Sequence, residues 1–138
     1  MGVGRYQDLI AWQMADSFKH EVFRLVRSSP SAEADFRYRG QLFAAAQSVT
    51  ANIAEGFLRN SPGDFKRFLN IGLGSLGEAE TRLSDGIQLG YFPSADCEAA
   101  FRFARRCATA CVRLRATQEL FIKSGKKRDT TEPEDPRT

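Results

Sequence analysis

Residues 61–92, which read SPGDFKRFLNIGLGSLGEAETRLSDGIQLGYF, carry a long helical pattern with a clear start and a clear end. Ser61 precedes a proline and Asp64 follows, so a capping hydroxyl, a proline at the first helical position and an early negative charge coincide. Small and apolar residues then recur at helical spacing: Phe65, Leu69, Gly72, Leu76, Ala79 and Leu83. The segment GYFP at 90–93 ends the pattern near Leu89. The stretch predicts one helix of roughly 28 residues, about 42 Å long.

Three further segments show the same periodicity, at 7–27, 36–57 and 94–123. The first ends at the turn formed by residues 28–30, and the last opens with Ser94 and Asp96. Their predicted buried faces are Ala11, Ala15, Phe18, Val22, Leu25 and Val26; Leu42, Ala45, Ala46, Val49, Ile53 and Gly56; and Cys97, Ala100, Ala104, Cys107, Cys111, Leu114 and Gln118. No window alternates with period two. The fold class is therefore all-α, and four amphipathic helices joined by short turns predict an antiparallel up-down four-helix bundle.

The chain of 138 residues fits one domain, which we expect to span residues 1–123. Residues 124–138 offer no apolar side chain to bury, so we expect a disordered charged tail. The balance of 20 Lys and Arg against 17 Asp and Glu leaves a net charge of only +3, so affinity for nucleic acid requires local clustering of basic residues. The N-terminus lacks an apolar signal region and no window approaches a membrane span, which favours a cytoplasmic protein without a membrane partner.

Several short motifs resemble a known family. They are NIAEGF at 52–57, FxxFL at 65–69, GSxxE at 74–78 and LGY at 89–91. The chain from about residue 6 to residue 120 resembles the four-helix-bundle proteins encoded in intervening sequences of bacterial 23S ribosomal RNA genes. One branch of that family is the accessory variability protein of diversity-generating retroelements. The resemblance implies a pentameric barrel that binds nucleic acid and a reverse transcriptase.

Basic side chains are organised on the helix predicted at 94–123. Arg102, Arg106 and Arg113 fall within about 40° of one another, opposite the core face, and Arg105 lies alongside. A solvated surface, contact with phosphates and contact with an acidic protein all explain this pattern. Because arginine suits bidentate phosphate binding, our leading hypothesis is a non-enzymatic homo-oligomer that binds the RNA or DNA backbone. The alternative is a protein-interaction scaffold without nucleic-acid binding.

A second set of residues predicts the oligomer contact. Trp12 and Phe23 lie about 20° apart and about 90° or more from the core face of the first helix, so they form a second patch. Small or apolar residues also lie away from the core on the next two helices, namely Ala44, Ala51, Ile71 and Gly74. Distinct patches on several helices favour a heterologous ring over a single dimer contact.

Signals for catalysis, metals and cofactors have simpler explanations. Residues 72–77 match G-x-G-x-x-G, but that motif requires a strand before it and a helix that opens at it, whereas these glycines lie inside a helical pattern. His20 lies between Lys19 and Glu21, and we interpret it as a solvated surface residue. Glu55 and Glu78 could pair as acid and base or bind a metal, but the Glu-x-x-His motifs of bundle metal sites are absent, and we expect Asn52 and Glu55 to satisfy backbone groups or to meet Arg39. The sequence thus predicts no catalytic residue, metal or cofactor; a third alternative is an enzyme or small-molecule binder with a pocket between helices.

Overall fold

The computed structural model describes residues 4–125, and every regular element in this range is a helix. Short 3-10 helices cover Tyr6–Asp8 (η1) and Ser94–Cys97 (η2). The α-helices are α1 Ile10–Arg27, α2 Pro30–Ala34, α3 Phe36–Leu58, α4 Pro62–Gln88 and α5 Glu98–Ser124. The all-helical prediction is confirmed. The predicted boundary after residue 123 falls one residue before the end of α5, and the rest of the predicted tail, residues 126–138, lies outside the described residues.

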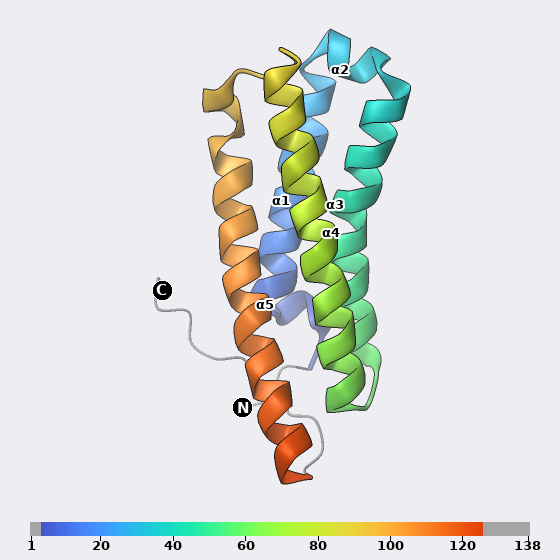
Figure 1. Cartoon of the computed structure of the whole chain (residues 1–138), viewed down its shortest axis with the longest axis vertical. Coiled ribbons are helices and arrows are strands. Elements are labelled where there is room, and N and C mark those ends of the chain that lie inside the picture. Colours follow the sequence, from blue (N-terminus) through green and yellow to red (C-terminus); the bar gives the residue numbers. More distant parts are fainter. Residues whose placement is uncertain (1–3, 126–138) are drawn as a thin grey trace.

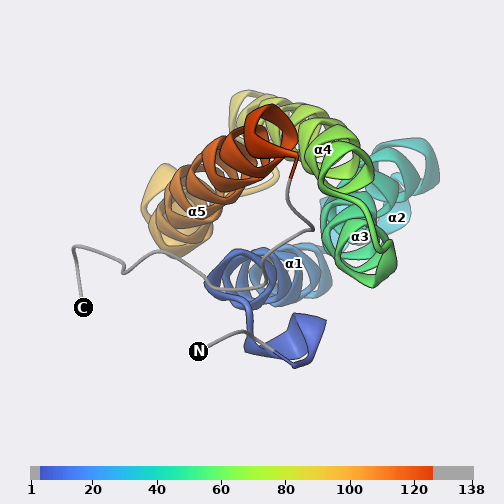
Figure 2. The same ribbon diagram turned by 90° about the horizontal axis from the view of Figure 1, so that it is seen from below.

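The four long helices α1, α3, α4 and α5 lie side by side around a common interior. Helix α3 packs against α1 and α4, and α5 packs against the same two helices. In Figure 1 the colours show that consecutive long helices run in opposite directions along the long axis of the molecule. Figure 2, the view along that axis, shows the four helices arranged around one centre.

The residues predicted for the four buried faces are all buried. The largest of them, including Phe18, Phe65, Leu69 and Leu114, are fully inaccessible. A helix with 3.6 residues per turn places side chains three and four positions apart on one face, so each apolar pattern defines its own buried stripe. Apolar surface removed from water in this way is the main source of the free energy of folding.

The ends of α4 follow the sequence signals closely. The Ser61 hydroxyl accepts a hydrogen bond from the Asp64 amide at 3.3 Å and so caps the first turn. At the other end Gly90 has a φ of 81°, and the Tyr91 amide donates to the Gly86 carbonyl at 2.8 Å. This is a Schellman motif, in which a left-handed residue lets the chain cap the last free carbonyls of the helix.

Three local predictions are corrected by the structure. Helix α1 begins at Ile10 rather than residue 7, because Leu9 takes an extended conformation and is fully buried. The turn predicted at 28–30 contains the short helix α2, whose N-cap Ser29 accepts from the Ala32 amide at 3.2 Å. Ser94 makes no capping bond; it opens η2, and α5 follows.

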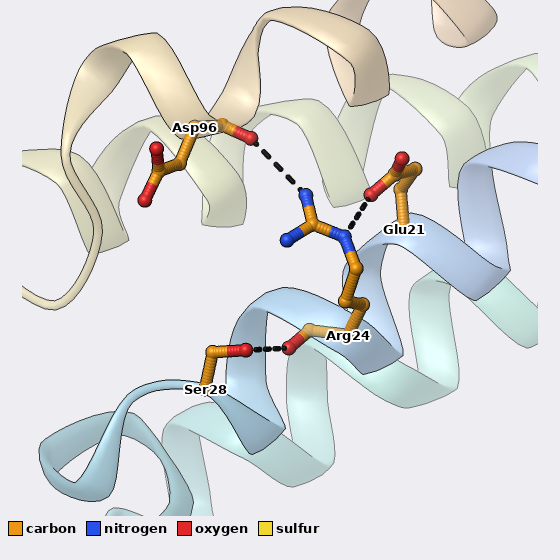
Figure 3. Close-up of polar contacts among 4 residues, drawn as sticks. All are labelled: Glu21, Arg24, Ser28 and Asp96. Carbon is orange, nitrogen blue, oxygen red and sulfur yellow. Dashed lines mark hydrogen bonds and ion pairs between the residues drawn. The ribbon is translucent and has the colours of Figure 1, made fainter.

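Arg24 connects the last turns of α1 to the approach to α5 (Figure 3). Its Nε donates to Glu21 Oε2 at 2.6 Å and its Nη2 to the Asp96 carbonyl at 3.5 Å. The carbonyl of Arg24 in turn accepts from the Ser28 hydroxyl at 2.8 Å. One arginine therefore joins two segments that lie 72 residues apart in the sequence and helps set the position of α5.

Candidate nucleic-acid interface

Helix α5 contains a long stretch without negative charge. Between Glu98 and Glu119 the sequence has five arginines and no Asp or Glu. The stretch covers roughly 20 residues, which is about 30 Å of helix. Arg102 and Arg105 are exposed, whereas Arg106 and Arg113 are half-buried. The predicted stripe is therefore a surface with two fully accessible guanidinium groups and two that lie deeper among their neighbours.

The surroundings of the two exposed arginines differ. The Arg102 guanidinium lies 5.7 Å from the centre of the Phe103 ring, which leaves its hydrogen-bond donors free to face solvent. Arg105 lies close to Glu80 of α4, a partly buried carboxyl. Burial raises the pKa of Glu80, and Arg105 acts in the opposite direction by favouring the charged form. Among residues 4–125 Arg102 forms no ion pair, and the charge of Arg105 is partly balanced by Glu80.

Two polar contacts fix the lower half of α5 against α4. Arg115 Nη1 donates to Asn70 Oδ1 at 2.9 Å, and Lys66 pairs with Glu119 at 2.6 Å. Sequence reasoning did not single out Arg115. Its angular position, about 140° from Arg102 on the helical wheel, separates it from the outer stripe and could have identified it as a contact to a neighbouring helix.

The residues predicted for an oligomer contact fall into two groups. Trp12 and Phe23 are half-buried and have aromatic partners in the same chain, namely Tyr6 at 5.5 Å and Phe43 at 4.9 Å between ring centres. The others lie on the outer surface of α3 and α4. These are Ala44, Ala51, Ile71 and Gly74, all exposed. The second group therefore lies on exposed surfaces of α3 and α4, and the two α1 aromatics pack within the chain.

Gly74 illustrates how open this outer surface is. A Cβ atom added there meets no heavy atom within 4 Å, and the same holds for Gly77 one turn further along α4. At Gly72 an added Cβ reaches Asn52 and Ile53 of α3 at 3.8 Å. The three glycines of the G-x-G-x-x-G match thus all lie inside α4, one facing α3 and two facing outward.

The remaining candidates have local partners. Asn52 Nδ2 donates to the Ser48 carbonyl at 2.8 Å, so Asn52 satisfies a backbone group, which was one of the two expectations. Glu55 pairs with Arg59 of its own helix at 2.9 Å, so the expected contact with Arg39 is wrong. His20 is exposed, and its Nε2 lies 3.5 Å from Asp16.

Arg39, Glu78 and the cysteines complete the set. Arg39 pairs instead with Glu33 at 3.0 Å, and Glu78 is exposed on α4. The three cysteines are free and buried, with 4.0 Å between the sulfur atoms of Cys107 and Cys111. Among residues 4–125 no group of three or more His, Cys, Asp or Glu side chains could hold a metal ion.

The described helices also bear on membrane association. Within residues 4–125 none combines the length and the apolar character that crossing a bilayer demands. Helix α5 is long enough, but its arginines exclude it.

Comparison with known proteins agrees with the motifs found in the sequence. The model of a family described as 23S rRNA-intervening sequence protein matches residues 7–110. This range includes η1, α1 to α4 and the first half of α5. No curated protein matches the chain.

Proposed function

Because this chain belongs to the family of 23S rRNA-intervening sequence proteins, we propose that it is a non-enzymatic homo-oligomer that binds the backbone of RNA or DNA. In this proposal the chain forms an antiparallel up-down four-helix bundle and α5 supplies the binding surface. The protein acts in the cytoplasm, and a reverse transcriptase is a further candidate partner.

The observation that carries the proposal is the stretch of α5 with five arginines and no acidic residue. The arginines run from Arg102 to Arg115, about 20 Å of helix, and phosphates follow one another every few ångströms along a nucleic acid, so this surface can contact several of them. Arg102 and Arg105 are the exposed members and make the closest approach in our proposal. A helix surface with arginines but without groove-reading geometry favours contacts to the backbone over readout of base edges.

Assembly would strengthen this weak surface. Several copies of α5 on one oligomer raise the effective concentration of binding sites, so the affinity for a long nucleic acid exceeds that of one subunit. The exposed Ala44, Ala51, Ile71 and Gly74 supply the contact, because small side chains let helices of another subunit approach closely. We propose a ring, and the family resemblance favours a pentamer.

The test is binding of fluorescently labelled single- and double-stranded RNA and DNA, measured by anisotropy over a range of salt concentrations. We expect affinity to fall steeply with salt. The double variant Arg102→Gln/Arg105→Gln removes two charges per subunit and should make the log–log salt slope shallower by about 1.4 for single strands and about 1.8 for duplexes, per subunit bound. This variant avoids the half-buried Arg106 and Arg113, whose loss would disturb folding.

The matched control is Arg5→Gln/Arg27→Gln, which removes the same charge from exposed positions outside α5. It should bind almost as the parent protein does. Equal losses in both double variants, or no binding by the parent at low salt, would remove α5 from the proposal.

A protein-interaction scaffold is the second candidate, and the open outer surface of α3 and α4 favours it. Light scattering tests assembly with Gly74→Arg, which places a long charged side chain on a site where nothing lies within 4 Å in the monomer. We expect the parent to be oligomeric and the variant to lose mass. An oligomer that binds none of the four nucleic acids tested would favour the scaffold. A parent protein that is monomeric in light scattering would refute assembly.

A further inference from the structure

A cavity of about 570 Å³ lies at one end of the molecule, between the start of α3 and the end of α4. Its lining residues lie at the ends of α3 and α4 and not on α5. It is lined at the start of α3 by Asp35, Arg37, Tyr38 and Gln41, and at the end of α4 by Arg82, Asp85, Gln88 and Leu89. The volume falls within the range of small-molecule sites, which is roughly 300 to 1,000 Å³.

Tyr38 helps to shape this cavity. The residue is only 8% exposed, and its hydroxyl donates to the backbone carbonyl of Arg82 at 2.6 Å. Burial raises the pKa of Tyr38, with the nearby Asp85 charge acting in the same direction, so the hydroxyl keeps its proton and remains a donor. Because that donor already has its acceptor, Tyr38 is part of the wall and not a group that recognises a ligand.

Asp35 is likewise already engaged. Its Oδ1 accepts from the Tyr38 amide at 3.1 Å as the N-cap of α3, and its Oδ2 accepts from the Tyr91 hydroxyl at 2.5 Å. These hydrogen bonds, the Tyr91 bond first, lower the pKa of the Asp35 carboxyl. Both oxygens are therefore used within the fold, and neither forms an ion pair with the arginines of the cavity.

Neither arginine of the cavity has an ion-pair partner in the described part of the chain. Arg82 Nε is buried and makes no hydrogen bond to any residue in the range 4–125. Within the same range, no carboxylate oxygen lies close enough to Arg37 or Arg82, at 4.0 Å or less, to form an ion pair. Buried donors in folded proteins are nearly always paired, so the unpaired Nε of an arginine that lines a cavity calls for an acceptor.

We propose that this cavity binds a small molecule carrying an oxyanion, either a phosphate or a carboxylate, through Arg82 and Arg37. Guanidinium groups present paired donors that match the oxygens of both anions. The side-chain amides of Gln41 and Gln88 can donate to the same oxygens. Asp35 is engaged within the fold, and Asp85, the other lining carboxylate, accepts a hydrogen bond from a hydroxyl or amino group elsewhere on the ligand. The site thus selects against highly charged anions, because Asp85 repels a second negative group.

The experiment follows the Arg Nε–H signals of the full chain by NMR while inorganic phosphate is added at constant ionic strength, and then acetate in a separate titration. A saturable shift of the Arg82 signal with either anion is the expected result. A shift with phosphate alone identifies a phosphate compound as the ligand class, and a shift with acetate alone identifies a carboxylate. No Arg82 shift with either anion at tens of millimolar, or equal unsaturable shifts of all arginines, overturns the proposal.

Two variants and one control make the test specific. Arg82→Gln should weaken anion binding about tenfold or more, whereas Arg67→Gln, an exposed arginine elsewhere on α4, should leave it unchanged. Asp85→Asn removes the repelling charge, keeps Arg82 and should tighten binding at least about twofold, so it serves even if Arg82→Gln fails to fold. Binding that survives in folded Arg82→Gln, or that Asp85→Asn weakens, counts against the site. None of these residues belongs to the α5 surface, so this result and the nucleic-acid result are independent.

Discussion

Gly86 is the position where one methyl group should disturb the structure most. It lies on the buried side of α4, beneath the rings of Tyr38 and Phe92. A Cβ atom placed on its backbone meets Phe92 Cε2 at 2.5 Å and Phe92 Cδ2 at 2.8 Å, and it overlaps the Tyr38 hydroxyl. Carbon atoms in contact prefer about 3.5 to 4.0 Å, so Gly86→Ala forces at least one ring to move.

The magnitude follows from three opposing effects. Alanine gains roughly 1 kcal/mol over glycine in a helix interior. Overpacking a tight core costs about 1 to 3 kcal/mol. Displacing Tyr38 also weakens its 2.6 Å bond to the Arg82 carbonyl, which is worth about 1 kcal/mol. Gly86→Ala should therefore lower the free energy of unfolding by about 1 to 3 kcal/mol.

Thermal and urea unfolding of Gly86→Ala and Gly77→Ala make a matched comparison. Gly77 lies in the same helix, but an added Cβ there meets nothing within 4 Å, so this change should stabilise the protein by about 0.5 to 1 kcal/mol. For a chain of this size each kcal/mol corresponds to roughly 3 to 5 °C in Tm. The two variants should thus differ in sign. If Gly86→Ala melts at or above the parent temperature, the rings are not held against this glycine and the reasoning fails.

Three further predictions concern the ends of the helices and the core. Tyr91→Phe removes the first cause of the lowered pKa of Asp35, so the carboxyl should titrate closer to its ordinary value in an NMR pH series. A carboxyl whose pKa is lowered stabilises the fold above its unfolded pKa and loses that effect as pH falls through its folded pKa, so Tyr91→Phe should destabilise more at neutral pH than in acid; equal losses would contradict this. Ser61→Ala removes the α4 cap and should lower the free energy of unfolding by about 0.5 to 2 kcal/mol in urea, unless another group replaces the hydroxyl. All three cysteines are fully buried and should react with a thiol reagent only after unfolding, so labelling of the folded protein would show that the core opens.

The sequence was sufficient for the four long helices and for their buried faces, because both depend on local periodicity, but it did not predict α2, η1 or η2. It did not predict contacts that depend on which helix lies beside which. Leu9 is fully buried, yet it lies before the periodic part of α1 and no repeat includes it. Tyr38 of α3 and Phe92 after α4 pack against Gly86 of α4. This contact joins three segments, and no sequence pattern within one segment predicts it.

The arginines of α5 show the same limit. A helical wheel places Arg102, Arg106 and Arg113 in one narrow arc, but it treats the helix as if one face alone were covered. Helix α5 has two neighbours, α1 and α4, and these cover more than the arc that points to the centre. Arg106 and Arg113 are half-buried as a result, while Arg102 stays exposed. These residues differ in exposure because of the neighbouring helices, which a sequence pattern within α5 does not contain.

The motifs that identify the family act mainly in the fold. In NIAEGF at 52–57, Gly56 leaves room for the α4 aromatics, since an added Cβ would meet Phe68 Cβ at 2.8 Å. In LGY at 89–91, Gly90 supplies the left-handed turn, and Tyr91 donates to the carboxylate that caps α3. Such residues define how the helices meet, and a chain that retains them keeps the architecture whatever it binds. Both proposals therefore place binding at positions outside the motifs: the exposed arginines of α5 for nucleic acid, and Arg82 for a small anion.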